Sequence, residues 1–238
     1  LIFTVPTILF VVLALWLREP VRGAHERRAM GADEEVAGTE EVAPSFGEGW
    51  RMVWKIETLR RIWYSLPFLG ASLIGFVSLA ALMYEDQFGL DEKARGFVAA
   101  GVEPAQLLGL VYGARIATRL MAKDISLVLR FLSLVAFVVS GGLLVFGLAP
   151  NLGVAIAANV LIAATLAVLG PGILAALSLA IPARARSIGF SVGALWVTPG
   201  LIALPIIGWI ADRWGIRWGM LVMVPVFLVG GLIIATAG

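Results

Sequence analysis

Residues 125–148 read ISLVLRFLSLVAFVVSGGLLVFGL, an apolar run that contains one charged side chain, Arg130. The hydrocarbon core of a membrane is about 30 Å thick, and a helix needs about 20 apolar residues to cross it. The run meets that length, whereas core helices of soluble proteins rarely extend so far with so little charge. The chain is therefore predicted to be an all-α integral membrane protein, a polytopic helix bundle. Further apolar runs occupy residues 1–17, 65–84, 97–120, 154–181, 188–211 and 220–237.

The composition agrees with this class. Hydrophobic residues make up 60% of the chain and charged residues 14%, against roughly 45–50% and about 25% in soluble domains. The small net charge of +2 gives no sign of a nucleic-acid partner, and the absence of cysteine excludes a disulfide scaffold and thiol chemistry in this chain. Residues 1–17 lack the basic start and the cleavage site of a signal peptide, so we expect the chain to open partway through a membrane helix.

Basic residues are distributed unevenly over the loops. When alternate loops are assigned to alternate sides, most of the 18 lysines and arginines fall on one side, and the other side holds Lys93, Arg95, Arg213 and Arg217. Cytoplasmic loops carry an excess of Lys and Arg, so the richer side is predicted to face the cytoplasm. The last run then points inward and ends without a basic anchor, so we expect the chain to be cut short at this end too.

The sizeable polar segment lies between the first two runs. Residues 32–44 are acidic and lack an apolar face, which predicts a flexible linker. Ser45 and Glu48 have the spacing of a capping box. After them, apolar residues recur at helical spacing among basic ones, which predicts an amphipathic helix on the inner membrane surface, in contact with anionic lipids. A plain basic helix that only sets topology is the alternative. The apolar positions are Met52, Ile56, Leu59 and Trp63.

Two features of the runs concern helix packing. Small residues recur at a spacing of four at Gly109, Gly113 and Ala117, and again at Gly189 and Gly193. Such residues let helix backbones approach closely in a membrane. Proline and glycine within a membrane helix can interrupt its backbone hydrogen bonds, and such interruptions are tolerated where they are buried in protein or line a cavity. The interruptions in this chain are therefore candidate hinges or static kinks. They lie at Gly170, Pro171, Gly172, Pro199 and Gly200.

Four short stretches resemble motifs of the major facilitator superfamily. Residues 113–120 (GARIATRL) are similar to the family's G-x-x-x-A-D-R-L loop, and residues 182–189 to its P-x-x-x-R-x-x-G turn. Residues 208–217 resemble the G-x-x-x-D-x-x-G-x-R turn before its twelfth helix. Residues 17–23 (LREPVRG) are similar to the end of the sixth helix, with the nearest likeness in the spinster-like branch.

The resemblance implies a domain division and a function. Residues 1–17 would end the sixth helix, residues 18–64 would form the central cytoplasmic loop, and residues 65–238 would form the C-terminal six-helix domain. It implies a secondary transporter in the plasma or bacterial inner membrane, which moves a small molecule by alternating access together with an N-terminal six-helix half. The scarcity of buried charge favours an amphipathic substrate. No cofactor is implied.

One departure from the family pattern concerns the gating motif, formed here by Gly113, Arg115, Thr118 and Arg119. Thr118 stands where the motif normally has Asp. Threonine can donate a hydrogen bond but cannot form the charge-assisted bond of a carboxylate, which is roughly twice as strong. The latch in this half is therefore expected to be weak. Arg115 and Arg119 either contact lipid phosphates or extend to the interface and fix topology.

Conventional enzyme chemistry is not predicted. The single histidine, His25, lies in the polar segment, so neither a Ser-His pair nor a multi-histidine metal site can be built. The sequence also lacks a Gly-rich phosphate loop followed by Lys. In a transporter, polar groups within the membrane indicate functional sites, because they are costly to place there and usually serve a function.

Glu103 is the main candidate for such a task, with Gln106 on the same helical face. Shielding from water disfavours a charged carboxylate, so Glu103 could load a proton outside and release it inside. The alternative is a solvated residue at a helix start, because Pro104 suits the first helical position. Trp196, in mid-span, either stacks on a substrate or packs between helices. The remaining tryptophans, Trp63 among them, are expected in interfacial belts.

Two other classes are weighed against a secondary transporter. The first is a seven-helix photoreceptor or signalling receptor; one that binds retinal would need a lysine in its last span, and residues 220–238 contain none. The chain could instead be the membrane domain of a transport system linked to an ATP-binding cassette. That would change the energy source without changing the fold of these residues.

Overall fold

The structure is a computed structural model that describes Leu13 and residues 44–238. The chain divides into two units, Leu1–Pro44 and Ser45–Gly238, and every helix from Phe46 onward belongs to the second unit. The predictions for the end of a sixth helix at residues 1–17 and for a linker at residues 32–43, together with His25, fall outside the described residues.

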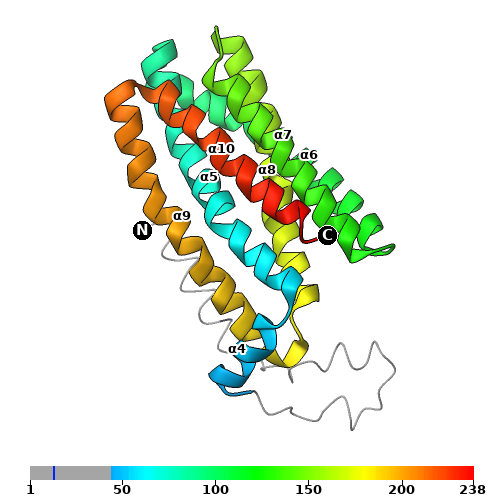
Figure 1. Cartoon of the computed structure of the whole chain (residues 1–238). Coiled ribbons are helices and arrows are strands. Elements are labelled where there is room, and N and C mark those ends of the chain that lie inside the picture. The colour runs from blue at the N-terminus through cyan, green and yellow to red at the C-terminus, as the bar shows by residue number, and fades with distance from the viewer. Residues whose placement is uncertain (1–12, 14–43) are drawn as a thin grey trace. The chain divides into compact units, whose positions relative to one another are not determined.

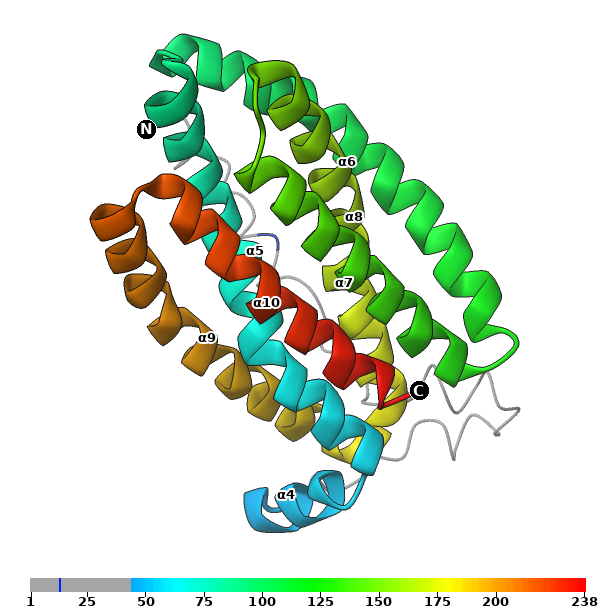
Figure 2. The same cartoon turned by 45° about the horizontal axis from the view of Figure 1, so that its top comes forward.

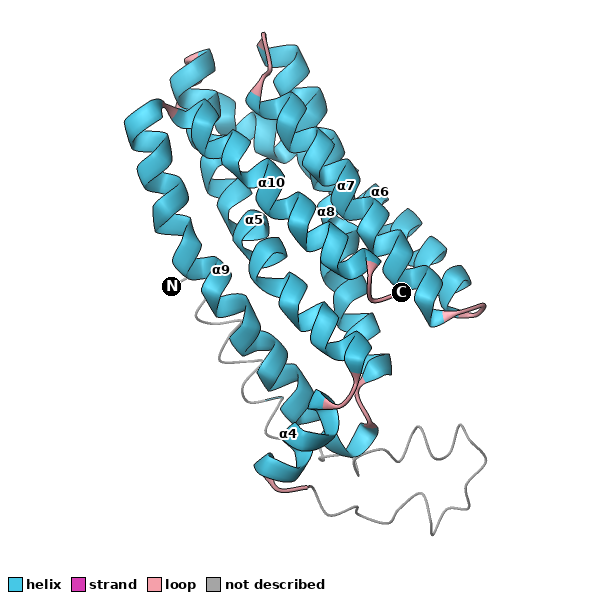
Figure 3. Ribbon diagram, viewed as in Figure 1, coloured by secondary structure: helices cyan, strands magenta, loops and turns pink. Residues whose placement is uncertain are grey.

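The described part of the chain is helical and contains no strand (Figures 1 and 3). Six of its helices are long and apolar enough to cross a membrane, and each contains one of the predicted runs to within two residues. This confirms an all-α, multi-pass membrane protein. The elements are α4 (Phe46–Trp54), α5 (Glu57–Phe88), α6 (Glu92–Met121), α7 (Ile125–Gly147), α8 (Leu152–Ala180), the 3-10 turn η1 (Ala183–Ala185), α9 (Arg186–Trp214) and α10 (Ile216–Ala235).

The six long helices pack in a defined order (Figure 2). Helix α10 packs between α5 and α7, α7 packs on α8, and α6 and α9 flank the bundle, on α8 and α5 respectively. Phe146 of α7 and Phe227 of α10 are fully buried in the core. Helices α6 and α9 are the least buried of the six, so each leaves much of its surface uncovered in this chain.

Glycines set the close contact between α6 and α8. A Cβ added at Gly109 would lie 2.0 Å from the carbonyl oxygen of Ala164, and one at Gly113 would lie 2.3 Å from a methyl of Val168. Real Cβ atoms do not approach other atoms so closely. The glycine spacing in the sequence therefore marks a true helix-packing face, as predicted.

The predicted hinge residues lie in continuous helices. Helix α8 runs through Pro171, and α9 runs through Pro199 and Pro205. Gly200 is a packing position, because a Cβ there would lie 2.1 Å from the carbonyl oxygen of Pro67 on α5. Gly172 likewise faces the side chain of Leu132, at 2.4 Å. A hinge role for these positions stays a prediction.

The capping box is present at the start of α4. The Ser45 backbone N–H donates to a Glu48 carboxylate oxygen at 3.1 Å, and the Glu48 N–H donates to the Ser45 hydroxyl at 3.5 Å. Hydrogen bonds from the Ser45 hydroxyl and backbone hold the pKa of Glu48 below its ordinary value. The carboxylate thus stays charged, and the cap stays intact, to a lower pH than an ordinary glutamate would allow.

The predicted amphipathic helix is shorter than expected. Helix α4 ends at Trp54, Ile56 is extended, and α5 begins at Glu57, so residues 57–64, assigned to the loop, are already helical. Val53 of α4 and Trp63 of α5 are both fully buried, and α4 contacts α9 as well as α5.

Trp63 was expected in an interfacial belt, but it lies inside the bundle. Its side chain is fully buried, and its ring stacks at 6.4 Å from Trp50 and at 6.0 Å from Trp54. The expectation was wrong because the break before α5 rotates Trp63 towards the core. Trp209, Trp214 and Trp218 are exposed near the other end of the bundle, as a belt requires.

We predict that Gly109→Ala destabilises the bundle. The added methyl would meet a backbone oxygen, so α6 must move away from α8, and overpacking of this kind costs about 1–3 kcal/mol. The free energy of unfolding can be measured by SDS titration followed by circular dichroism. Gly101→Ala is the matched control, because Gly101 lies on the same helix with nothing within 4 Å of an added Cβ. Equal stability of the two variants would refute the packing argument.

Candidate functional site

A cavity of about 460 Å³ lies between α5, α6 and α8. It lies towards the C-terminal end of α5 and the N-terminal ends of α6 and α8, in the half that the charge distribution assigns to the outside. Most of its wall is apolar, formed by residues such as Leu73, Val77 and Leu166. A concave, mainly apolar cavity with a few polar groups is the usual form of a small-molecule site.

Two of the polar groups are the predicted pair on α6. Glu103 and Gln106 lie one helical turn apart, and both line the cavity. Within the described residues, Glu103 forms neither an ion pair nor a hydrogen bond. Glu103 does not start a helix, because α6 begins at Glu92 and is capped by the side chain of Asp91, which accepts from the Ala94 N–H at 2.8 Å. Its side chain is nevertheless exposed in the described part of the chain.

A second polar pair joins α8 to α5 at the cavity wall. The side-chain amide of Asn159 donates to the Tyr84 hydroxyl at 3.0 Å. Both side chains are buried, Asn159 at 8% exposure and Tyr84 at 3%. Polar atoms are costly to bury without a hydrogen-bond partner, and this bond gives each side chain a partner. The Tyr84 ring packs edge-on against Phe146, with ring centroids 5.6 Å apart. Sequence reasoning missed this pair.

Arg95 supplies the positive charge in the cavity wall. It forms an ion pair with Glu85 of α5 and also donates to the Ala81 carbonyl oxygen at 3.5 Å. The pair ties α6 to α5 near their outer ends. The charge of Arg95 is therefore already matched by a carboxylate, whereas that of Glu103 is not.

Trp196 lies away from this cavity. It is partly buried on α9 and packs edge-on against Tyr64 of α5, with centroids 5.0 Å apart. The structure thus shows Trp196 packed between helices, which is one of the two roles considered for it. A contact with substrate stays a prediction.

The residues of the gating motif lie at the far end of α6. Gly113 packs on α8, and the Thr118 hydroxyl donates to the Ala114 carbonyl oxygen of its own helix at 2.9 Å. Arg115 and Arg119 are exposed, and the described residues offer neither of them a hydrogen bond or ion pair. In this part of the chain, Thr118 therefore makes no link to a neighbouring helix end.

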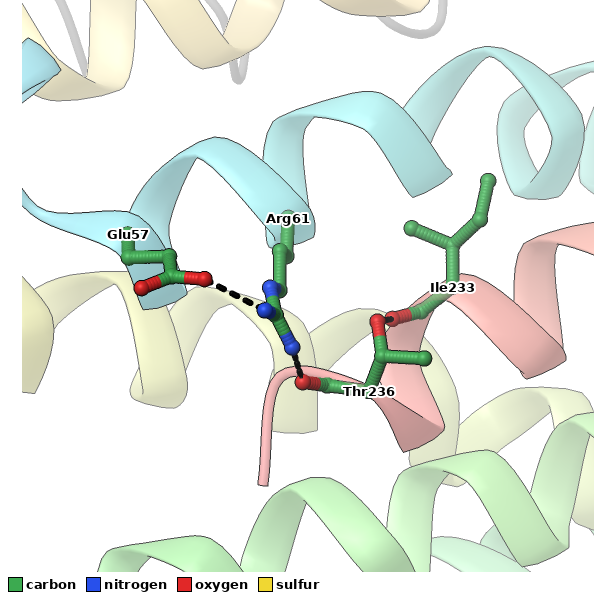
Figure 4. A network of polar contacts seen from close by, with 4 residues as sticks. All are labelled: Glu57, Arg61, Ile233 and Thr236. Atoms are coloured by element: carbon green, nitrogen blue, oxygen red, sulfur yellow. Dashed lines mark hydrogen bonds and ion pairs between the residues drawn. The ribbon is translucent and has the colours of Figure 1, made fainter.

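A different link joins α5 to α10 at the end predicted to be cytoplasmic (Figure 4). Arg61, in the second turn of α5, forms an ion pair with Glu57 and donates to the carbonyl oxygen of Thr236, the C-cap residue of α10. The Thr236 hydroxyl donates to the Ile233 carbonyl oxygen at 2.7 Å. A guanidinium suits this place because the last carbonyls of a helix carry partial negative charge.

The fold has a counterpart among solved structures. It is similar to a crystal structure of the fucose:proton symporter of E. coli, with a TM-score of 0.64, over 97% of this chain and at 18% sequence identity. The chain spans about half the length of that protein, 52%. No protein-family model matches the chain, and no curated protein matches it in sequence. The likeness shows that this chain has the fold of about half of that symporter.

We predict that Tyr84 and Asn159 are energetically coupled. In a double-mutant cycle with Tyr84→Phe and Asn159→Ala, the unfolding free energies should reveal a coupling of about 0.6 kcal/mol, and at most about 1.7, as for other hydrogen bonds between membrane helices. Pairing Tyr84→Phe with Ser140→Ala gives the control, because the Ser140 hydroxyl donates to Ala136 of its own helix. Zero coupling in the first cycle would contradict the hydrogen bond.

Proposed function

We propose that this chain is the C-terminal half of a secondary transporter that moves a small amphipathic molecule by alternating access. The observation that carries the proposal is the cavity between α5, α6 and α8, where polar side chains from three membrane-spanning helices meet. Intramembrane polar groups of this kind usually mark a solute or ion pathway. The facilitator-type fold supports the same function.

A second half would complete the pathway. The proposed division is the end of a sixth helix at residues 1–17, a cytoplasmic loop at residues 18–64 and the six-helix domain at residues 65–238. Helices α6 and α9 leave the largest uncovered faces, and an N-terminal six-helix half would pack on them. The match to about half of a symporter supports this partner.

Glu103 is proposed as the proton-coupling group. It faces the cavity without a partner among the described residues, and Gln106 beside it can orient a solute. The structural neighbour is itself a proton symporter. Gly113, Arg115, Thr118 and Arg119 are proposed to serve the cytoplasmic gate.

Other predicted roles belong to the same proposal. Bending at Gly170–Gly172 and at Pro199–Gly200 would accompany the change of access, and Trp196 would contact the solute in one state. The basic residues of the cytoplasmic side would contact anionic lipids of a plasma or bacterial inner membrane. The spinster-like branch is suggested by residues 17–23 alone.

We predict that Glu103→Gln uncouples transport from protons. The full-length gene product is reconstituted in proteoliposomes with an acidic exterior and without ATP. In the wild type, adding a transported solute should cause protons to cross the membrane, which a pH-sensitive dye trapped inside the vesicles detects. The variant should lose the solute-dependent proton movement even at solute concentrations high enough to sustain its counterflow, because an amide cannot carry the proton. Glu92→Gln is the control, since Glu92 lies on the same helix outside the cavity.

Two results would count against the proposal. Coupled proton movement that survives in Glu103→Gln would remove Glu103 from the pathway. Transport that requires ATP and ignores the proton gradient would instead favour the alternative of an ATP-linked membrane domain.

A further inference from the structure

The charges around the cavity do not balance. Arg95 is the basic residue of its wall, and Glu85 already pairs with it. Glu103 is the remaining charged group of the wall, and the described residues give it no partner. The cavity thus presents one uncompensated carboxylate on a mainly apolar wall, and the Glu103 side chain is exposed in the described part of the chain, so a solute can reach it.

The neutral polar groups of the wall add hydrogen-bond acceptors. Asn159 uses its N–H to donate to the Tyr84 hydroxyl, which leaves the side-chain oxygen of the buried Asn159 free to accept. Gln106, beside Glu103, carries a second amide oxygen. Acceptors grouped with a carboxylate suit the N–H groups of an ammonium ion.

Two aromatic rings also line the cavity. Phe76 and Tyr84 both pack edge-on against Phe146, at centroid distances of 5.7 and 5.6 Å, which fixes their orientation. The face of an aromatic ring attracts a cation, and the attraction grows when water is excluded. The apolar remainder of the wall suits hydrocarbon, and the volume of about 460 Å³ falls in the range of drug-sized ligands.

We propose that this cavity binds an amphipathic organic monocation, an amine or quaternary ammonium compound with an apolar body, and that the Glu103 carboxylate is its counter-ion. The inference rests on the proposed function, since it names the chemical class of the solute that the pathway carries. An anionic solute would have to displace Glu85 from Arg95 and would meet the unpaired Glu103.

Two probes of nearly equal size and opposite charge test the proposal. The full-length gene product in lipid nanodiscs is titrated with radiolabelled tetraphenylphosphonium, and the same is done with tetraphenylborate. We expect saturable binding of the cation and none of the anion. Glu103→Gln should weaken cation binding up to roughly fivefold, because it removes the charged partner of the cation at an exposed wall. Glu103→Asp should retain most of the affinity, and Glu92→Gln all of it.

The remaining outcomes separate this inference from the proposed function. Saturable binding of tetraphenylborate, or cation binding that is equal in wild type and Glu103→Gln, would overturn the monocation assignment. If Glu103→Gln still abolished solute-driven proton movement with another solute, the transporter would stand with a different substrate class. Circular dichroism and gel filtration of each variant exclude misfolding as the cause of lost binding.

Discussion

The close contact of α6 with α8 at Gly109 and Gly113 is the constraint on which the cavity depends. In a membrane, lipid is as apolar as the helix surface, so helices associate through close packing and hydrogen bonds instead of the hydrophobic effect. Helix α6 is the least buried of the six and makes most of its contacts with α8. The two glycines let its backbone reach the backbone of α8. This contact holds Glu103 and Gln106 opposite α5.

The other polar contacts are arranged around that geometry. Helices α5 and α6 make few direct contacts, and the Arg95–Glu85 pair bridges them at the outer end. The bond from Asn159 to Tyr84 joins α8 to α5 below it. Asn159 and Tyr84 are buried and satisfy each other, as burial requires, whereas the Arg95–Glu85 pair is partly exposed. Glu103 and Gln106 make no such contact in the described part of the chain, and both side chains are exposed, so a solute in the cavity can reach them.

Much of the fold could be predicted from the sequence. Apolar runs locate membrane helices because the bilayer sets their length, and the glycine spacing located the α6–α8 contact. The shared face of Glu103 and Gln106 followed from helical periodicity. The break at Ile56 could not be predicted in this way, since periodicity continues through it, and Trp63 was misplaced for that reason. Tyr84, Asn159 and Arg95 were missed because their meeting depends on how three helices pack, which no single segment encodes.

The distribution of fixed contacts also indicates where movement costs least. At the end predicted to be cytoplasmic, Arg61 ties the start of α5 to the Thr236 carbonyl oxygen at the end of α10. At the other end, Arg217 of α10 donates to the Gln87 side chain at 2.7 Å and to the Ala149 carbonyl oxygen at 3.1 Å. Helices α5 and α10 are thus tied together at both ends, and α10 is also tied to the loop after α7 at the second end. Helices α5 and α6 are joined by the partly exposed Arg95–Glu85 pair and by the bond from Arg95 to the Ala81 carbonyl oxygen, and an exposed ion pair usually contributes about 0–1 kcal/mol. The glycine contact with α8 is therefore the main anchor of α6, and its contact with α5 is the weaker one.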